Sequence, residues 1–371
     1  MNGKIALAVC ILSRTACALQ GKQNKLQPKG NTPEDKIENL IAQMTFEQKI
    51  GQLFVVGFPG TTPDGVVLDL VQKYHVGGII HYDRNLITPE QVRALNAGLQ
   101  KGARIPLYVC VDQEGGQVAR MRRYLPVAPS AAELGRGNNP AVANQWAIKT
   151  AKALQDLGIN TNFAPVADLG YARERSYGNT VQEVTPFVIA AMQGYEECKI
   201  NSAVKHFPGQ GRALRDSHYN TVVIDASKNE LLASDLLPFQ TVVKKFDQRN
   251  YMLMVSHPFY TAFGNVPACA SKELITGLVR QEWGYQGLII TDDLVDMAGI
   301  NQVYSLQEVG VKVFLAGADI LLCCSADTDK AIQVYEGVLA AARQKQISEQ
   351  RINASVKRIL LNKYAVGIMN I

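Results

Sequence analysis

Charged and imidazole side chains follow several short apolar runs of the sequence, in a pattern suited to nucleophilic and acid–base chemistry. Asp112-Gln113-Glu114 follows one run, Lys205-His206 ends another, and Asp292-Asp293 follows a third. Burial of charge is costly unless the charge is paired or used. We therefore predict that five such chain positions meet in one active site. The full set comprises Asp112 to Arg120; Asp168, Arg173, Arg175 and Tyr177; Lys205 to Gly211 with Asp216 and His218; His257; and Asp292 with Asp293.

Eight apolar runs, separated by segments with helical periodicity, predict the strands that position these residues. The runs are continuous, which is typical of strands buried on both faces of a parallel sheet. Eight βα units in ~330 residues fit a single (β/α)8 TIM-type barrel of the α/β class, with elaborated βα loops and the active site at the C-terminal strand ends. A doubly wound sheet is the alternative, but no glycine-rich phosphate loop follows the first run. The predicted strands are Leu53–Phe58, Val76–Tyr82, Pro106–Asp112, Thr161–Ala167, Ala203–Phe207, Met252–His257, Leu288–Thr291 and Ala318–Cys323.

Capping residues predict where several of the intervening helices begin. Thr or Asn before Pro places an N-cap before a proline in the first turn, and Thr45 with Gln48 forms a capping box. Gly158 is suited to a helix C-terminus because glycine adopts positive φ without strain. The predicted starts are Thr32-Pro33, Thr45-Phe46, Asn139-Pro140, Thr185-Pro186 and Ser348.

Composition excludes several classes of protein. The 371 residues are 47% hydrophobic and 19% charged, which excludes a disordered or fibrous chain. No apolar run reaches the ~18 residues that a transmembrane span needs. The formal charge is +5, but the basic residues are scattered, so no nucleic-acid partner is expected. The cysteines after residue 18 follow neither a disulfide framework nor a zinc-ligand spacing, and we predict no metal and no cofactor.

The N-terminus has the pattern of a short secretory signal. Lys4 precedes the apolar segment Ile5–Leu12, and Ala16-Cys17-Ala18 fits a small-x-small cleavage site. We therefore divide the chain into a signal peptide (1–18), a linker (19–33) and a catalytic barrel domain (34–371). An exported protein, periplasmic or secreted, is expected if the signal is real. If the segment is only an N-terminal extension, the protein is cytoplasmic.

The chain resembles glycoside hydrolase family 3, specifically its single-domain β-N-acetylglucosaminidase branch. The similar stretches span residues ~40 to 325 in family order, and an ordered set is far more specific than any one of its members. They include Met44-Thr45, Lys49–Leu53, Gly77–Ile80 with Arg84-Asn85, Asp112–Gly116, Asn162–Val166, Arg175–Gly178, Lys205–Gly209, Asp216–His218 and Thr291–Leu294.

The resemblance implies catalytic roles for three residues. Asp292 matches the family's nucleophile, and its neighbour Asp293 is interpreted as structural, because successive strand positions point to opposite sides. His218 matches a histidine that acts as acid and base, with Asp216 as the partner that orients its ring.

The resemblance also implies a sugar-binding set. It consists of Asp112, Arg120, Arg175, Lys205 and His206, whose charges would strengthen hydrogen bonds to sugar hydroxyls. Arg120 paired with Glu114 is the structural alternative for that residue. Glu114 is interpreted as a brace for the loop Gly115-Gly116, and His257 as a strand-end histidine with satisfied hydrogen bonds. Gln117 and Gln210 depart from the family pattern.

The predicted function is a retaining exo-β-N-acetylglucosaminidase that removes terminal β-linked N-acetylglucosamine (GlcNAc) from cell-wall fragments or related amino-sugar glycosides. Phosphate in place of water as the acceptor stays open. The alternatives are a metal-dependent barrel hydrolase that uses Asp292, Asp293, His206 and His257, a Schiff-base aldolase that uses Lys205, and a catalytically silent GlcNAc-binding barrel. A saccharide substrate and a monomer are expected.

Overall fold

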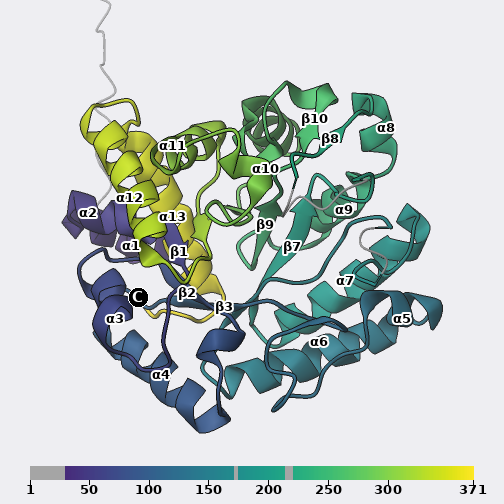
Figure 1. The fold of residues 1–371 in the computed structure, drawn as a ribbon, viewed down its shortest axis with the longest axis horizontal. Helices are drawn as coiled ribbons and strands as arrows, with labels where there is room; N and C mark the ends of the chain where they lie inside the picture. The colour runs from purple at the N-terminus through teal and green to yellow at the C-terminus, as the bar shows by residue number, and fades with distance from the viewer. Residues whose placement is uncertain (1–29, 171–173, 214–219) are drawn as a thin grey trace, which may run out of the picture.

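Eight parallel strands form the centre of the molecule, and each coincides with one of the predicted apolar runs (Figure 1). The structure is a computed structural model that describes residues 30–170, 174–213 and 220–371. The strands are shorter than predicted at most of their ends. Their bounds are β1 (Phe54–Val56), β2 (Gly78–His81), β3 (Tyr108–Val111), β6 (Thr161–Asn162), β7 (Asn201–Phe207), β9 (Tyr251–Val255), β11 (Leu288–Thr291) and β12 (Leu321–Cys323).

The sheet order shows that the strands form a barrel. Its hydrogen-bonded order is β11-β9-β7-β6-β3-β2-β1-β12. At one end of this order, Phe54 of β1 pairs with Leu321 of β12. The two remaining edges meet through a parallel bridge between Ile290 and Ile320, with the Thr291 amide 3.1 Å from the Ile320 carbonyl oxygen. The predicted TIM-type (β/α)8 barrel is confirmed.

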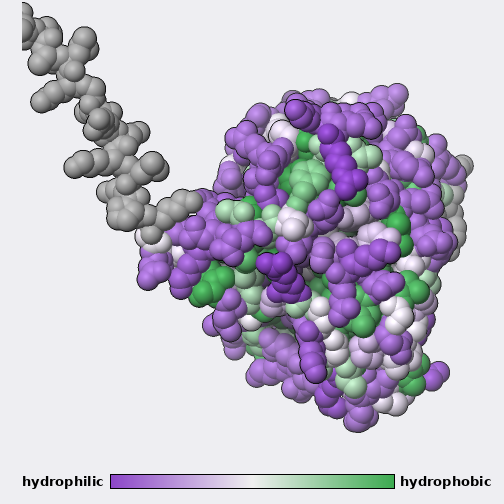
Figure 2. Space-filling model, turned by 90° about the vertical axis from the view of Figure 1, so that its left-hand side faces the viewer, coloured by the Kyte–Doolittle hydropathy of each residue, from purple (hydrophilic) through white to green (hydrophobic). Residues whose placement is uncertain are grey.

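Helices follow every barrel strand and surround the sheet (Figure 1). The face shown in Figure 2 is mainly hydrophilic, and its hydrophobic residues form separate small areas. None of the helices in the described ranges combines the length and apolar character of a membrane span. The α-helices are α1 (Pro33–Gln43), α2 (Phe46–Gln52), α3 (Gly65–Gln72), α4 (Pro89–Gly102), α5 (Ala131–Arg136), α6 (Pro140–Gln155), α7 (Val181–Glu197), α8 (Lys228–Ala233), α9 (Leu237–Lys245), α10 (Ala298–Asn301), α11 (Leu306–Ala316), α12 (Thr328–Arg343) and α13 (Glu349–Ala365); a π-helical segment, η4, covers Glu273–Glu282.

Four of the five predicted helix starts are confirmed, and one is wrong. Helices α1, α2, α6 and α13 begin after their predicted N-caps, and Gly158 has φ +73° just beyond α6. Helix α7 begins at Val181, so Pro186 lies inside it. The Thr180 hydroxyl accepts from the Glu183 amide, and the Glu183 carboxylate accepts from the Thr180 amide. This capping box starts the helix more than a turn earlier and outweighs the hydrogen bond that Pro186 cannot donate.

Two small additional sheets elaborate the loops at the C-terminal ends of the barrel strands. Strands β4 (Gln113–Gly115) and β5 (Val118–Ala119) form an antiparallel pair directly after β3. Strands β8 (Val223–Ile224) and β10 (Phe259–Tyr260) form a parallel pair after β7 and β9. The barrel strands themselves are buried on both sides, as the continuous apolar runs predicted, so their polar side chains concentrate at the strand ends.

Candidate active site

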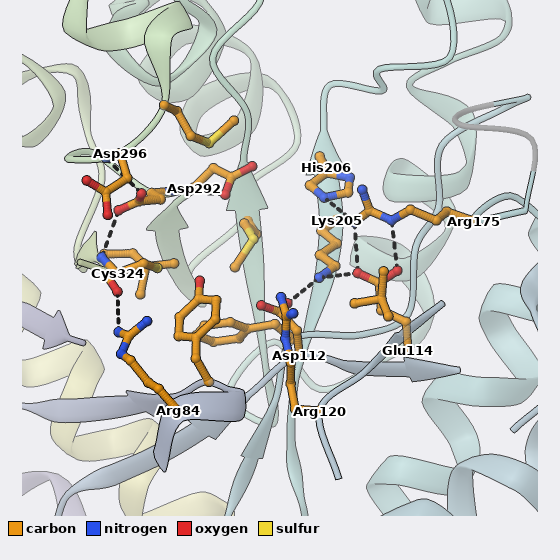
Figure 3. Close-up of a pocket in the computed structure, with 17 residues that line it drawn as sticks. Arg84, Asp112, Glu114, Arg120, Arg175, Lys205, His206, Asp292, Asp296 and Cys324 are labelled. Atoms are coloured by element: carbon orange, nitrogen blue, oxygen red, sulfur yellow. Dashed lines mark hydrogen bonds and ion pairs between the residues drawn. The ribbon is translucent and has the colours of Figure 1, made fainter. Parts of the chain in front are cut away.

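A cavity of about 390 Å³ opens at the C-terminal ends of the barrel strands (Figure 3). Side chains on or directly after seven of the eight strands line it, which is the position of active sites in TIM barrels. Apolar lining from Phe163, Met254 and Leu322 accompanies a large charged set. The charged residues are Arg84, Asp112, Glu114, Arg120, Arg175, Lys205, His206, Asp292, Asp293 and Asp296.

Lys205 and His206 both reach this cavity from adjacent positions of β7. Successive strand residues normally point to opposite faces. The register of β7 against β9 shifts between Val204 and Phe207, so the regular alternation is interrupted there. The irregular strand end therefore delivers both side chains to one site.

Glu114 is the centre of a buried ion-pair network. Its carboxylate accepts two hydrogen bonds from Arg175, at 2.9 and 2.8 Å, and lies 2.6 Å from the Lys205 ammonium nitrogen. Lys205 Nζ also lies 2.6 Å from Asp112 Oδ1. Burial opposes the charge on Glu114, but Lys205 and Arg175 outweigh it and hold its pKa far below the ordinary value. The carboxylate thus pairs with the cavity cations rather than bracing Gly115-Gly116, which corrects that interpretation.

The same network makes Lys205 unsuited to Schiff-base chemistry. Burial alone would lower the pKa of Lys205, but Asp112 and Glu114 outweigh burial and raise it above the ordinary value. A Schiff base requires a neutral amine, whereas these contacts favour the ammonium form.

The His206 ring lies between a carboxylate, that of Asp168, and a guanidinium group, that of Arg175. Its Nδ1 lies 2.6 Å from Oδ2 of Asp168, a fully buried carboxylate in the segment that follows β6. Its Nε2 lies 3.2 Å from Arg175 Nη2. Asp168 was predicted among the strand-end polar residues but without a role, because no local sequence feature links it to a histidine 38 positions later.

Asp292 and Asp293 follow β11, and their carboxylates have different surroundings. Asp293 accepts hydrogen bonds from the backbone amides of Val295, Asp296 and Cys324, and burial raises its pKa to about 6. Asp292 Oδ1 accepts only from the Asp293 amide, and within the described residues Oδ2 has no hydrogen-bond partner.

Both carboxylates line the cavity, but only that of Asp292 is left available to a ligand. Burial would raise the pKa of Asp292, yet His206 and His257 together with the Asp293 amide lower it below the ordinary value. The site therefore holds an ionised carboxylate with a free oxygen facing the cavity.

Arg120 and Arg84 lie at one side of the cavity (Figure 3). Both guanidinium groups also pack against the ring of Tyr82. Their guanidinium carbons are 4.9 and 4.7 Å from the ring centroid. Arg120 pairs with Asp83 at 3.5 Å and not with Glu114, so the structural alternative for Arg120 is wrong. Tyr82 was not among the predicted site residues; it directly follows β2 and was predicted as the last residue of that strand.

Several candidates lie elsewhere. Asp216, His218 and Arg173 fall outside the described residues. His257 does not line the cavity: its Nε2 lies 2.7 Å from the Asp293 carbonyl oxygen and its Nδ1 3.2 Å from Cys269 Sγ, as expected for a satisfied strand-end histidine. In the part of the chain that the structure describes, no group of three or more His, Cys, Asp or Glu side chains is arranged to hold a metal ion.

Comparison with known families and sequences gives a consistent result. Residues 45–361 match the family model for the glycosyl hydrolase family 3 N-terminal domain. Beta-hexosaminidase A of Pseudoalteromonas piscicida is 31% identical over 331 residues, which are 81% of this chain and 55% of that protein. The beta-hexosaminidase of Haemophilus influenzae strain Rd is 30% identical, over 80% of this chain and 86% of that protein. The chain therefore spans little more than half of one relative and most of the other.

Solved structures agree with the sequence matches. A family 3 beta-N-acetylglucosaminidase from a Paenibacillus strain superposes with a TM-score of 0.84 at 34% identity, over 88% of this chain and 63% of that one. The M. tuberculosis protein LpqI superposes with a TM-score of 0.79 at 30% identity, over 87% of this chain and 95% of that one.

Proposed function

The chain belongs to glycosyl hydrolase family 3, and on that premise we propose that it is a retaining exo-β-N-acetylglucosaminidase. The observation that carries the proposal is the pair of unequal carboxylates after β11. Asp292 is ionised with one oxygen free toward the cavity, whereas backbone amides occupy Asp293. A retaining glycosidase needs one such carboxylate to attack the anomeric carbon.

The cavity supplies groups that suit one terminal sugar ring. Lys205 and Arg175 are donors, Asp112 is an acceptor, and each is held by a charged partner before any ligand arrives. Pre-organised, charge-assisted hydrogen bonds are stronger than neutral ones and cost less ordering on binding. The volume of about 390 Å³ is typical of a small-molecule site. These features support recognition of a chain end and release of one GlcNAc unit.

In the proposed reaction, Asp292 Oδ2 attacks the anomeric carbon while the bond from that carbon to the leaving oxygen breaks. His218 donates a proton to the leaving oxygen, and Asp216 orients its ring. Water then attacks the anomeric carbon, gives its proton to His218 and releases the sugar from Asp292. Proton transfer of this kind is efficient near neutrality because an ordinary histidine has a pKa of about 6.5.

The natural substrates we propose are GlcNAc-terminated cell-wall fragments or related amino-sugar glycosides. We also propose that residues 1–18 direct export, which places the enzyme in the periplasm or outside the cell, and that it acts as a monomer. Cell fractionation and light scattering of the purified protein test these two points independently of activity.

The central test is release of a chromogenic phenol from its β-N-acetylglucosaminide by the parent, Asp292→Ala and His218→Ala. We expect activity in the parent, near-complete loss in the first variant and strong reduction in the second. Parallel assays with added phosphate distinguish phosphorolysis from hydrolysis, and a chelator arm tests the metal-dependent alternative. An inactive parent that binds GlcNAc would favour the silent binder. Activity that survives Asp292→Ala would refute Asp292 as the nucleophile.

A further inference from the structure

The Asp168 carboxylate contacts the His206 ring and also accepts two hydrogen bonds from backbone amides. Its side chain is fully buried, and Oδ1 accepts hydrogen bonds from the backbone amides of His206, at 3.2 Å, and Gln210, at 2.8 Å. Oδ2 lies 2.6 Å from His206 Nδ1. The segment before it is also tied to β7, because the Ala167 amide donates to the Lys205 carbonyl oxygen at 2.6 Å. One carboxylate therefore fixes both the backbone and the ring of His206.

Two described residues, Asp168 and Arg175, contact the imidazole ring, and their chemistry indicates which nitrogen carries the proton. A carboxylate that already accepts two amide hydrogen bonds acts as an acceptor, so Nδ1 donates to Asp168. A guanidinium can only donate, so Nε2 accepts from Arg175. Arg175 cannot easily turn away, because Glu114 holds its guanidinium by two hydrogen bonds. Neutral His206 is thus fixed in the Nδ1–H tautomer.

We propose that Asp168 is a positioning residue that holds His206 in the Nδ1–H tautomer and thereby keeps an acceptor, Nε2, at the cavity beside Arg175. The effect on catalysis rests on the proposed function, whereas the tautomer does not. Asp168 does not line the cavity. Of the two residues that its carboxylate contacts, His206 lines the cavity and Gln210 does not, so its effect on the cavity passes through His206.

Asp168→Asn is the sharpest perturbation because asparagine has nearly the same shape. Its oxygen still accepts from the amides of His206 and Gln210, while its amide nitrogen donates toward His206 Nδ1. The proton then has to move to Nε2, where it meets the Arg175 donor at a nitrogen–nitrogen distance of 3.2 Å. The variant therefore moves the ring proton from Nδ1 to Nε2 and keeps the hydrogen bonds from the backbone amides of His206 and Gln210.

The tautomer is measured by long-range ¹H–¹⁵N correlation NMR on the full chain with labelled histidine, between pH 6 and 9. The sequence has five histidines, and loss of one spin system in His206→Gln assigns the ring. We expect the Nδ1–H form in the parent and the Nε2–H form in Asp168→Asn. An Nε2–H or doubly protonated ring throughout this range in the parent, or an unchanged tautomer in Asp168→Asn, would overturn the proposal.

Two further variants keep the test decisive. Asp235→Asn removes another buried carboxylate, one paired with Arg212 at 2.8 Å, and should leave the His206 tautomer unchanged. Arg175→Met removes the donor at Nε2, and the Nδ1–H form should persist because Asp168 sets it. A switch in Arg175→Met would assign the tautomer to Arg175 instead, and this arm stands even if Asp168→Asn fails to fold.

The kinetic arm uses the chromogenic glycoside. Partners that orient metal-bound histidines are typically worth about 10–100-fold, and by analogy we expect a fall of about that size in kcat/KM for Asp168→Asn. The fall should nearly vanish when Asp168→Asn is introduced into His206→Gln, because the residue acts through this ring. Equal losses in both backgrounds would indicate a merely structural role. An inactive parent would refute the proposed function while the NMR result still decides the role of Asp168.

Discussion

Both ends of the barrel hold buried charged side chains, but the two groups differ in what they leave unsatisfied. At the C-terminal end, Glu114 pairs with both Lys205 and Arg175 beside an open cavity, and Asp292 keeps one oxygen without a hydrogen-bond partner among the described residues. At the N-terminal end, helix α13 covers the strand starts, and its side chains complete the hydrogen bonds there.

Asp319, which precedes β12, is the centre of the group at the N-terminal end. It is fully buried and pairs with Arg280, Arg358 and Arg351 at 2.5, 3.0 and 3.7 Å. It also accepts from the Ile289 amide, at 3.1 Å, and the Ser355 hydroxyl, at 2.6 Å. Every oxygen is thus occupied by the protein itself.

This difference shows that a buried charge cluster does not by itself mark an active site. In the N-terminal cluster, protein donors occupy both oxygens of Asp319, and the contacts of Arg351, Ser355 and Arg358 join α13 to the barrel. In the C-terminal cluster, Glu114 holds Lys205 and Arg175 at the cavity, where they can also donate to a ligand. The comparison therefore predicts that substitutions at the two ends affect different measured quantities.

Asp292→Asn should have the largest effect, and only on activity. Loss of the attacking carboxylate should reduce kcat by about 10⁴-fold or more, as for other catalytic nucleophiles that act together with an acid–base partner. The melting temperature should change little, because Asp292 makes only one hydrogen bond. Thermal melting and the chromogenic assay check both points. A strongly destabilised variant would contradict the prediction that Asp292 affects activity and not stability.

Asp319→Ala should have the opposite signature. Three arginines lose their common partner in a buried environment, which should lower the free energy of unfolding by about 3–5 kcal/mol. The activity of the folded fraction should be retained. Urea denaturation measures the loss, and Arg343→Ala, which breaks an exposed pair with Glu47, is the control at about 1 kcal/mol or less. A loss no larger than the control's would show that the cluster contributes little.

Glu114→Gln should lower both the activity and the free energy of unfolding. The amide can replace some hydrogen bonds but not the charge that holds Arg175 and Lys205. Loss of charged hydrogen bonds of about 1.5–3 kcal/mol corresponds to a fall of roughly 10–150-fold in kcat/KM. Initial-rate kinetics with parallel denaturation curves test this, and an unchanged kcat/KM would mean that Glu114 serves stability alone.

Lys363→Met should change how stability depends on pH. Lys363 Nζ is buried 2.9 Å from both Gln52 Oε1 and the Gly77 carbonyl oxygen, and burial lowers its pKa to about 7. In the unfolded chain its pKa is near 10.4, so between these values the unfolded state binds more protons and stability rises with pH.

The relevant measurement is the difference in unfolding free energy between parent and Lys363→Met at pH 7 and pH 9. The parent should gain up to about 2 kcal/mol relative to the variant across this interval, since a single group contributes at most about 1.4 kcal/mol per pH unit. Parallel pH profiles for the two proteins would show that Lys363 has an ordinary pKa in the fold.

Most of the architecture could be predicted from the sequence because its signals are local. Each barrel strand overlaps one of the predicted apolar runs, and four predicted N-caps begin their helices. Even the error at Pro186 was local, since the capping box of Thr180 and Glu183 was present in the sequence and was overlooked. The barrel topology then placed Asp112, Lys205, His206 and Asp292 around one cavity.

By itself, the sequence determined which residues stand at the strand ends, because burial on both faces excludes charge from all but the end positions of the strands. The tertiary structure alone decided which of them are partners. Glu114 and Arg175 are 61 positions apart, and Asp168 and His206 are 38 apart. Hydrogen bonds require contact within about 3 Å, and only closure of the barrel brings such distant positions to that distance and gives each charge its partner.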